Sequence, residues 1–463
     1  MNRLHAASLL VALGLSTLGS TAHAQDPGYA PAGGGAANLG VAATSDVEPS
    51  SIEPGGDVTP PAEPVVLVAP SEITPPAEPV APPAPAAPAA PAPSGSAVTA
   101  RYAVGDGLTI ASEDGLFTLK FKGYMQLRFT VSDGVQDEVP ASTELVVRRM
   151  RFTIGGQFVV PELTYAAQFV FANGDMESDL RVPLLDAWVN YSAARDFQLR
   201  VGQAKVPYGS LFNISSANQQ FADASIVKSE LGMEYDMGVY AYSKDLFGLG
   251  NRLQYQLGMF SGDGRNRTST RSGLLWAARV EFTPFGKFET GAESDHARSS
   301  DPRLQLAFSA ALNKNTVRSR SISGDTYTLG GFDYQHLDAE LMFKVAGFSL
   351  QAEWLWRNAT TDSHSHMNMD GTTSTEYARS AWGYVAQAGY LLSCGFEVAA
   401  RYGDVQPRAG SPASQHRARE VGGALSYYFE KHALKLQADY FYLYGEAFDD
   451  GHHQVRVQAQ LQF

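Results

Sequence analysis

Basic side chains recur at every second position in two stretches of the sequence, and this spacing limits the chemistry that they can perform. Lys120 and Lys122 form one such pair, and Arg149 and Arg151 form another. Residues two apart on a β-strand point to the same face of a sheet, so each pair would present its N–H donors together. Such charge-assisted donors can replace part of the water around a hydrated anion.

These pairs belong to a larger set of basic residues between positions 116 and 203. On the face that the pairs would share, we count six basic residues and one acid, Asp186, whereas the faces of later segments are nearly balanced in charge. Arg148 would point to the opposite, lipid-facing side and extend toward the interface. We expect these residues to form a basic wall that favours anions. The alternative is that they are solvated side chains of the wall that do not select among ions. The candidate binding residues are Lys120, Lys122, Arg128, Arg149, Arg151, Arg200 and Lys205.

Patterns for catalysis or metal binding are weak in this sequence. It contains no Gly-x-Ser-x-Gly, Walker A, His-Glu-x-x-His or calcium-loop motif. The single cysteine excludes a disulfide framework and a cysteine-built zinc site. His364 with His366, and His452 with His453, lie among polar loop residues, which favours solvated histidines over metal ligands. We expect no enzyme activity, catalytic residue, metal or cofactor, and the excess of 48 acidic over 35 basic residues argues against nucleic acid.

The N-terminal residues predict export from the cytoplasm. Arg3 precedes an apolar stretch at residues 9–18, and a small-x-small cleavage site follows at residues 22–24. Residues 1–24 are therefore interpreted as a signal peptide.

Residues 25–99 have the composition of a linker. Of the 25 prolines in the chain, 17 lie between Pro27 and Pro93, in a segment without lysine or arginine before residue 99. Such a segment cannot bury a core, so we expect a disordered, extended periplasmic tether. An inert linker and a contact with the cell wall are its two candidate roles.

The remaining residues, 100–463, show the period of half-buried β-strands. Residues 454–463 alternate between apolar and polar side chains without a break, and residues 117–129 show the same signature. A strand with one apolar and one polar face suits both a soluble sandwich and a membrane barrel. The number of strands and the order of the loops distinguish these two folds.

The pattern predicts about 16 strands, joined alternately by long and short connections. This sorting is typical of an outer-membrane barrel, whereas residues 283–302 depart from it. The expected strands lie near residues 116–130, 145–159, 163–172, 184–192, 197–203, 236–242, 252–260, 274–282, 303–312, 336–345, 348–357, 382–392, 396–403, 421–429, 434–442 and 454–463.

Several segments of the sequence resemble the phosphate-selective porin O and P family over about residues 105–463. The resemblance implies a channel of about 16 strands that is usually trimeric and is narrowed by its third loop, here residues 204–235. The matching segments are Arg148–Phe152, Arg200–Gly209, Gly258–Gly264, Ala278–Gly286, Gln351–Glu353, Phe396–Tyr402 and Ser426–Phe429.

The sequence therefore predicts an all-β protein: a transmembrane antiparallel β-barrel of about 16 strands in the bacterial outer membrane, after a disordered proline-rich segment. The expected function is a porin that passes small hydrophilic solutes by diffusion, with a preference for anions such as phosphate. We expect outer-membrane lipid and a homotrimer as partners. A barrel-embedded hydrolase and a structural barrel tethered to the cell wall are the alternatives.

Overall fold

The computed structural model describes residues 98–463, except residues 135–140, 178–179, 269–272 and 290. The expected signal peptide lies outside the described residues, as does the proline-rich segment up to residue 97. Residues 98 and 99, which we assigned to the linker, already belong to the first strand.

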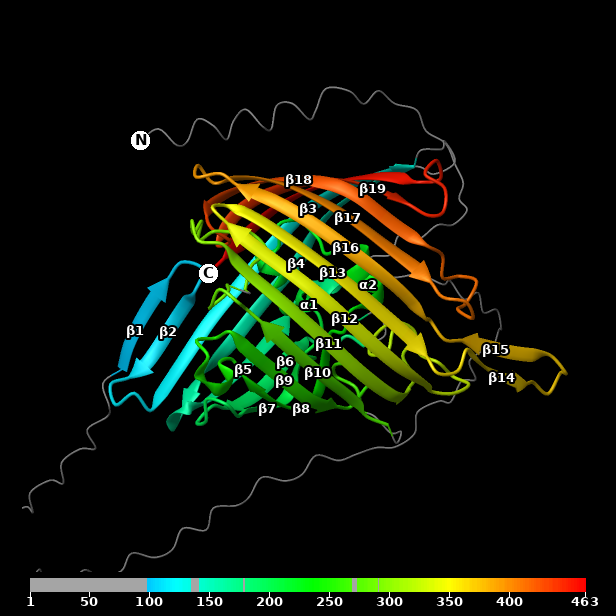
Figure 1. The fold of residues 1–463 in the computed structure, drawn as a ribbon, viewed down its shortest axis with the longest axis horizontal. Helices are drawn as coiled ribbons and strands as arrows, with labels where there is room; N and C mark the ends of the chain where they lie inside the picture. Colours follow the sequence, from blue (N-terminus) through cyan, green and yellow to red (C-terminus); the bar gives the residue numbers. More distant parts are fainter. Residues whose placement is uncertain (1–97, 135–140, 178–179, 269–272, 290) are drawn as a thin grey trace, which may run out of the picture. The chain divides into compact units, whose positions relative to one another are not determined.

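The chain forms a closed antiparallel β-barrel of 16 strands (Figure 1), which confirms the predicted fold class. Each strand pairs with its neighbours along the chain, and β20 pairs with β3 to close the ring. The strands of the ring are β3 (Phe117–Gly134), β4 (Ser142–Phe158), β5 (Val160–Val170), β6 (Leu184–Tyr191), β7 (Gln198–Lys205), β8 (Tyr235–Ser243), β9 (Leu253–Phe260), β10 (Leu275–Phe282), β11 (Arg303–Thr316), β12 (Phe332–Val345), β13 (Phe348–Ala359), β16 (Ala381–Leu391), β17 (Phe396–Pro407), β18 (Ala418–Glu430), β19 (Leu434–Tyr444) and β20 (His452–Gln462).

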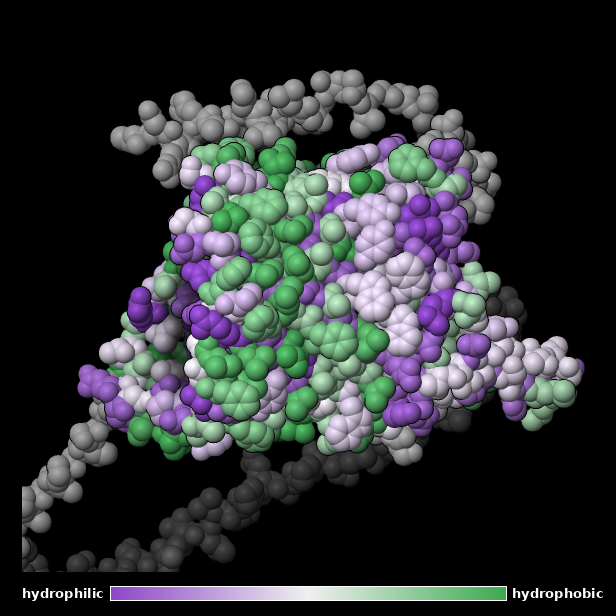
Figure 2. Space-filling model, in the orientation of Figure 1, coloured by the Kyte–Doolittle hydropathy of each residue, from purple (hydrophilic) through white to green (hydrophobic). Residues whose placement is uncertain are grey.

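Side chains on the strands alternate between an apolar outer surface and a polar interior. On β11, for example, Leu306 and Phe308 are exposed outward, whereas Gln305 and Ser309 are buried inside. Hydrophobic residues form a broad band across the visible face of the barrel, flanked by hydrophilic residues (Figure 2). This arrangement explains why a period of two was visible in the sequence.

Helical structure is sparse in the described residues. The helical segments are α1 (Ser210–Asn213), α2 (Ile226–Leu231) and the short 3-10 turns η1 (Asn173–Asp175), η2 (Ser216–Asn218) and η3 (Leu246–Gly248). Among the residues that the structure describes, no helix is long and apolar enough to cross a membrane.

Two hairpins lie outside the ring and were not predicted. The first, β1 (Val98–Ala103) with β2 (Gly107–Ser112), pairs through β2 with the beginning of β3. The second, β14 (Ser363–Met367) with β15 (Thr373–Tyr377), forms a separate two-stranded sheet in the long loop after β13. Both are short, and their residues lack the long alternation that identifies the wall strands.

Two connections fold into the barrel instead of lying outside it. The inner loop (residues 206–234) joins β7 to β8 and contains α1, η2 and α2. The inner turn (residues 283–302) joins β10 to β11 at the opposite end of the barrel, where the other connections are short. Its inward fold accounts for the departure of residues 283–302 from the expected loop lengths. Buried Glu293 bonds to the inner loop at Gln220, and buried Asp295 accepts a hydrogen bond from Gly347 in the turn between β12 and β13.

The last residue of the chain completes the ring. The backbone of Phe463 exchanges two hydrogen bonds with Gly123 on β3, of 2.7 and 2.9 Å. Its ring packs edge-on against Phe152 on β4, with 5.6 Å between the ring centroids. The final aromatic residue therefore ties the last strand to the first two.

Candidate channel constriction

The inner loop is hydrogen-bonded to an acidic wall formed by β12 and β13. Glu340 accepts a hydrogen bond of 2.9 Å from the backbone N–H of Ser210, and Glu353 accepts one of 3.0 Å from Leu211. Gly209 has a positive φ of 68° directly before α1, and a Cβ there would lie 2.6 Å from Glu353 Oε1. Glycine thus permits the close approach of the loop to this wall.

The joint between β3 and β20 also supports the inner loop. Gln126 on β3 donates a hydrogen bond of 3.2 Å to the carbonyl oxygen of Ser216. Gln460 on β20 donates one of 2.9 Å to the carbonyl of Ala217. Gln126 also donates to Oε1 of Gln460 at 2.6 Å, so the two glutamines connect the joint and the loop in one network.

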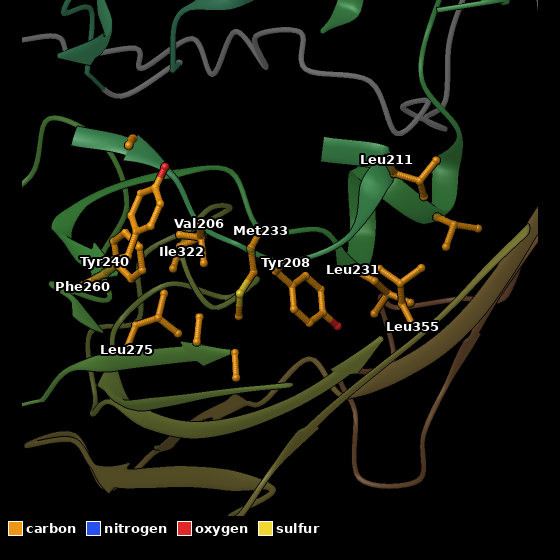
Figure 3. Packing of buried hydrophobic residues seen from close by; sticks show 14 of the residues in the cluster. Val206, Tyr208, Leu211, Leu231, Met233, Tyr240, Phe260, Leu275, Ile322 and Leu355 are labelled. Atoms are coloured by element: carbon orange, nitrogen blue, oxygen red, sulfur yellow. The ribbon is translucent and has the colours of Figure 1, made fainter. Parts of the chain in front are cut away.

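Apolar side chains hold the ends of the inner loop against the wall (Figure 3). The loop supplies both of its ends to this cluster, and strands β8 to β11, β13, β16 and β17, with one of the long loops, supply the other side. The labelled residues are Val206, Tyr208, Leu211, Leu231 and Met233 of the loop, and Tyr240, Phe260, Leu275, Ile322 and Leu355 around it. With apolar packing at its ends and hydrogen bonds along its length, the loop is fixed across the lumen, as we expected.

Three arginines of β3 and β4 converge on a single carboxylate of the inner loop, Asp223. Arg128 Nη1 lies 2.6 Å from Asp223 Oδ2, and Arg149 Nη2 lies 2.9 Å from Oδ1. Arg148 Nη2 approaches Oδ2 at 3.5 Å. These arginines, together with Arg151, are called the arginine cluster below.

A second carboxylate, Asp175 on η1, contacts the same cluster from the long loop after β5. Arg151 donates two hydrogen bonds to it, of 2.7 and 2.9 Å, and Arg149 Nε lies 3.5 Å from Oδ1. The cluster therefore contains four guanidinium groups against two carboxylates. Every arginine of the cluster also helps to hold a loop.

The positive environment changes the acidity of both carboxylates. Burial alone would raise the pKa of Asp223, but the nearby Arg128, Arg148 and Arg149 hold it well below its usual value. Asp175 behaves in the same way: burial opposes ionisation, and Arg151 outweighs it, so that its pKa is lowered. Both groups remain ionised at neutral pH.

The expectation that Arg148 points toward lipid is wrong. Gln126 pairs with Arg149 and Leu127 pairs with Val147, so Arg148 is the extra residue of a β-bulge on β4. A bulge reverses the simple alternation and redirects a side chain. Arg148 donates a hydrogen bond of 3.0 Å to the carbonyl oxygen of Gly174 and joins the arginine cluster inside the barrel.

Lys120 and Lys122 lie nearer the beginning of β3 than the residues opposite Arg149 and Arg151 do. Lys122 lies opposite Thr153, two residues from Arg151, and Lys120 lies opposite Gly155. Lys120 forms an ion pair with Asp106 in the turn of the β1–β2 hairpin, and Lys122 is exposed. The hairpin supplies a carboxylate at the end of the barrel where β3 begins. The expected basic wall is thus divided into a cluster at the inner loop and a lysine pair near the hairpin.

Arg200 and Lys205, the two remaining candidates, contact other groups of the protein. The guanidinium of Arg200 lies 3.9 Å from the ring centre of Trp188, a cation–π contact on the inner face. Lys205 Nζ donates hydrogen bonds of 2.7 and 3.2 Å to the carbonyl oxygens of Phe212 and Asn213. Lys205 therefore braces the C-terminal end of α1.

A group of acids on the opposite wall faces the inner loop around Arg279. Asp338, Glu340 and Glu353 are buried and offer carboxylate oxygens that lie within 4.8 Å of one another. Arg279 forms ion pairs with Glu340 and with Glu281, the latter at 2.7 Å. Because the carboxylates of Glu340 and Glu353 accept hydrogen bonds from the loop backbone, this group acts as an anchor for α1.

A second arginine group, which sequence reasoning missed, surrounds Glu230 on α2. Arg357 Nη2 lies 2.6 Å from Glu230 Oε1, Arg379 Nη2 lies 2.8 Å from Oε2, and Arg320 Nε lies 3.3 Å from Oε2. Burial opposes ionisation of Glu230, but the three arginines lower its pKa. Arg320 and Arg379 lie in long loops without periodic spacing, so the sequence held no signal that would bring them together.

The inner turn meets the inner loop within the lumen. The N–H of Glu293 donates to the carbonyl oxygen of Asn218 at 3.1 Å, and the N–H of Gln220 donates to Glu293 Oε2 at 2.8 Å. Ser294 donates to Glu397 on β17 at 2.8 Å. Two segments that enter from opposite ends therefore narrow the lumen together.

A family model described as phosphate-selective porin O and P matches residues 119–463. The chain belongs to this family. Together with the closed barrel, membership identifies the protein as an outer-membrane porin channel of a bacterium. The match begins within β3, so the β1–β2 hairpin precedes the matched region of this porin.

Individual relatives of this porin are distant in sequence. An uncharacterised protein from Aquifex aeolicus is 24% identical over 299 residues, which cover 60% of this chain and 66% of that protein, just under two thirds of its length. The anion-selective porin from Comamonas acidovorans is 12% identical with a TM-score of 0.47, over 74% of this chain and 99% of that one. The channel DcaP of Acinetobacter baumannii is also 12% identical with a TM-score of 0.47, over 76% and 99%.

Proposed function

We propose that this porin passes small anions by diffusion in preference to cations. The carrying observation is the arginine cluster, in which four guanidinium groups meet two carboxylates beside the inner loop. A narrow lumen screens charge less than open water does, so this excess attracts anions at the constriction. The β-bulge at Arg148 supports the proposal because it adds a fourth arginine to the group.

We further propose phosphate as a solute class of this channel. Arginine presents several N–H donors in a planar fork that matches the oxygens of phosphate. The description of the family supports the same assignment. The exposed Lys122, with the partly exposed Lys120 that pairs with Asp106, fits a role as a basic group at the other end of the lumen, where it would receive anions that have passed the constriction. A homotrimer, the usual assembly of the family, is proposed as the assembled form.

The decisive experiment is the reversal potential of the full-length channel in a potassium chloride gradient. Arg148→Gln should shift the potential toward cation preference, since it removes one positive charge and leaves Asp223 paired with Arg128 and Arg149. Lys314→Gln is a matched control, because Lys314 is half-exposed and pairs with Asp333 away from the cluster. Phosphate should block the chloride current of the unaltered channel, and Arg148→Gln should weaken this block. Equal shifts in both variants would reject the proposal.

A further inference from the structure

Three successive turns at the end of the barrel with short connections are bonded to one another. They are residues 192–197, 244–252 and 283–287, and we call them the rim patch. The third is the exposed beginning of the inner turn, which enters the barrel at the buried Phe288. The backbone N–H of Phe247 donates to Asp196 Oδ1 at 3.0 Å, which joins the first turn to the second. Arg252 Nε donates to the carbonyl of Pro284 at 3.3 Å, which joins the second to the third. The patch is therefore a continuous surface rather than three separate loops.

The rim patch carries an excess of positive charge. Its basic residues are Arg195, Lys244, Arg252 and Lys287, and its acids are Asp196 and Asp245. Both acids already have partners: Asp196 pairs with Arg195 at 2.8 Å, and Asp245 accepts the N–H of Asn251 at 2.7 Å. Lys244 and Lys287 are exposed, and neither ammonium group has a hydrogen-bond partner in the part of the chain that the structure describes. Partial burial and the nearby Arg200 on the inner face lower the pKa of Lys244.

Large apolar side chains project from the same turns. Phe247 is 68% exposed, Phe285 is 51% exposed and Leu249 is 45% exposed. Phe247 also adopts a left-handed φ of 59°, a conformation that is uncommon for a residue other than glycine.

The position of the rim patch identifies its partner. Strands that lead into these turns end in exposed aromatic residues, Tyr191 on β6 and Phe282 on β10. Short turns of outer-membrane barrels face the periplasm, so the patch lies at the surface of the inner leaflet. Basic groups beside aromatic rings at such a boundary fit a phosphate headgroup above acyl chains.

We propose that the rim patch binds anionic phospholipids of the periplasmic leaflet. Lys244 and Lys287 contact the headgroup phosphate and its negative charge, while Phe247, Leu249 and Phe285 insert among the acyl chains. The proposal does not depend on the solute that the channel carries. A free phosphate ion would use the lysines but would leave the exposed rings without a partner.

The test is native mass spectrometry of the full-length porin titrated with dioleoyl phosphatidylglycerol or with the zwitterionic dioleoyl phosphatidylcholine. The unaltered protein should retain phosphatidylglycerol preferentially. Lys244→Gln with Lys287→Gln should weaken this binding by roughly tenfold or more, since each lysine near an anionic surface contributes about fivefold. Because neither ammonium group has a bonding partner, the double variant should fold normally. Arg101→Gln with Lys431→Gln, two exposed basic residues elsewhere at the same end, is the matched control and should leave binding unchanged.

Two additional arms separate the lipid from other ligands. Phe247→Gly removes the ring, and glycine adopts the positive φ at this position without strain. This variant should also weaken binding of phosphatidylglycerol. An excess of inorganic phosphate should not displace the lipid. Equal retention of both lipids, equal effects of the two double variants, unchanged binding in Phe247→Gly, or displacement by phosphate would each overturn the proposal.

Discussion

Asp223 on the inner loop accepts a hydrogen bond of 2.9 Å from Arg149 on β4, and this contact joins the constriction to the barrel wall. The same carboxylate is within reach of Arg128 and Arg148. The group that positions the loop is therefore also the group that offsets part of the positive charge. Loop position and ion selectivity should change together when this contact is altered.

The inner loop should stay anchored through Asp223 in moderately acidic solution. Burial opposes ionisation of Asp223, but the arginines hold its pKa well below the usual value of 3.8. A carboxylate with a lowered pKa stabilises the seated loop above its usual pKa, and this stabilisation is lost as the pH falls through the lowered value. Selectivity should thus stay constant from about pH 7 to about pH 4 as far as Asp223 is concerned. Asp223→Asn should increase anion preference and open-channel noise, and reversal potentials with single-channel recordings would check both.

Glu353→Ala should loosen α1, because the buried N–H of Leu211 loses its acceptor. The expected cost to the seated loop is about 1–3 kcal/mol. Glu353→Gln is the matched control, since its side-chain oxygen still accepts a hydrogen bond. Hydrogen exchange of residues 206–234 should accelerate in the alanine variant alone. Identical exchange in the two variants would show that Glu353 does not hold the loop.

Protonation of His296 in acid should weaken the attachment of the inner turn inside the barrel. The ring of His296 packs against Tyr428 and His432, with 4.6 and 4.5 Å between ring centroids. Burial, with a smaller effect of nearby lysines, lowers the pKa of His296 from 6.5 to about 4. The seated turn prefers the neutral ring, so its stabilisation is complete above pH 6.5 and declines as the pH falls to about 4.

This loss would be on the order of 3 kcal/mol or less. Conductance noise should therefore rise as the pH is lowered through this window. His296→Phe keeps a ring in place without a titrating group and should remove that rise. A pH response that persists in His296→Phe would assign the effect to another residue.

Loss of Phe463 should impair formation of the folded barrel. Its deletion removes two backbone hydrogen bonds with Gly123 and the ring contact with Phe152, together about 2–4 kcal/mol at the closing joint. The fraction of heat-modifiable protein in the membrane should fall, whereas Phe463→Tyr, which retains an aromatic ring, should assemble. Normal amounts of folded protein after deletion would contradict this role.

The wall of the barrel could be predicted because membrane and lumen impose opposite demands on neighbouring residues. The strand expected at residues 454–463 is found at His452–Gln462, and the other wall strands agree in the same way. The inward position of Arg148 could not be predicted, since it depends on one extra residue in β4 and nothing in the sequence marks a bulge. Assigning the face of a strand from odd and even residue numbers fails beyond any such insertion.

The partners of the arginines were beyond sequence reasoning for a different reason. Asp175 and Glu230 lie in segments without a hydrophobic period, and their positions depend on how these segments fold inside the completed barrel. Counting the charges along the strands therefore indicated a basic wall, but it could not identify the carboxylates that pair with its arginines. The ion pairs come from contacts between residues far apart in the chain, such as Glu230 with Arg379.

The glutamine bridge at the joint of β3 and β20 constrains the order of assembly. Gln126 and Gln460 bond to each other and also to the carbonyl oxygens of Ser216 and Ala217. These contacts exist only when the first strand, the last strand and the inner loop are in place at once. A ring that closed around an unplaced loop would lack both carbonyl partners of the bridge. Ring closure and loop placement should therefore occur in one cooperative kinetic phase, so that a barrel able to complete its wall also completes its constriction.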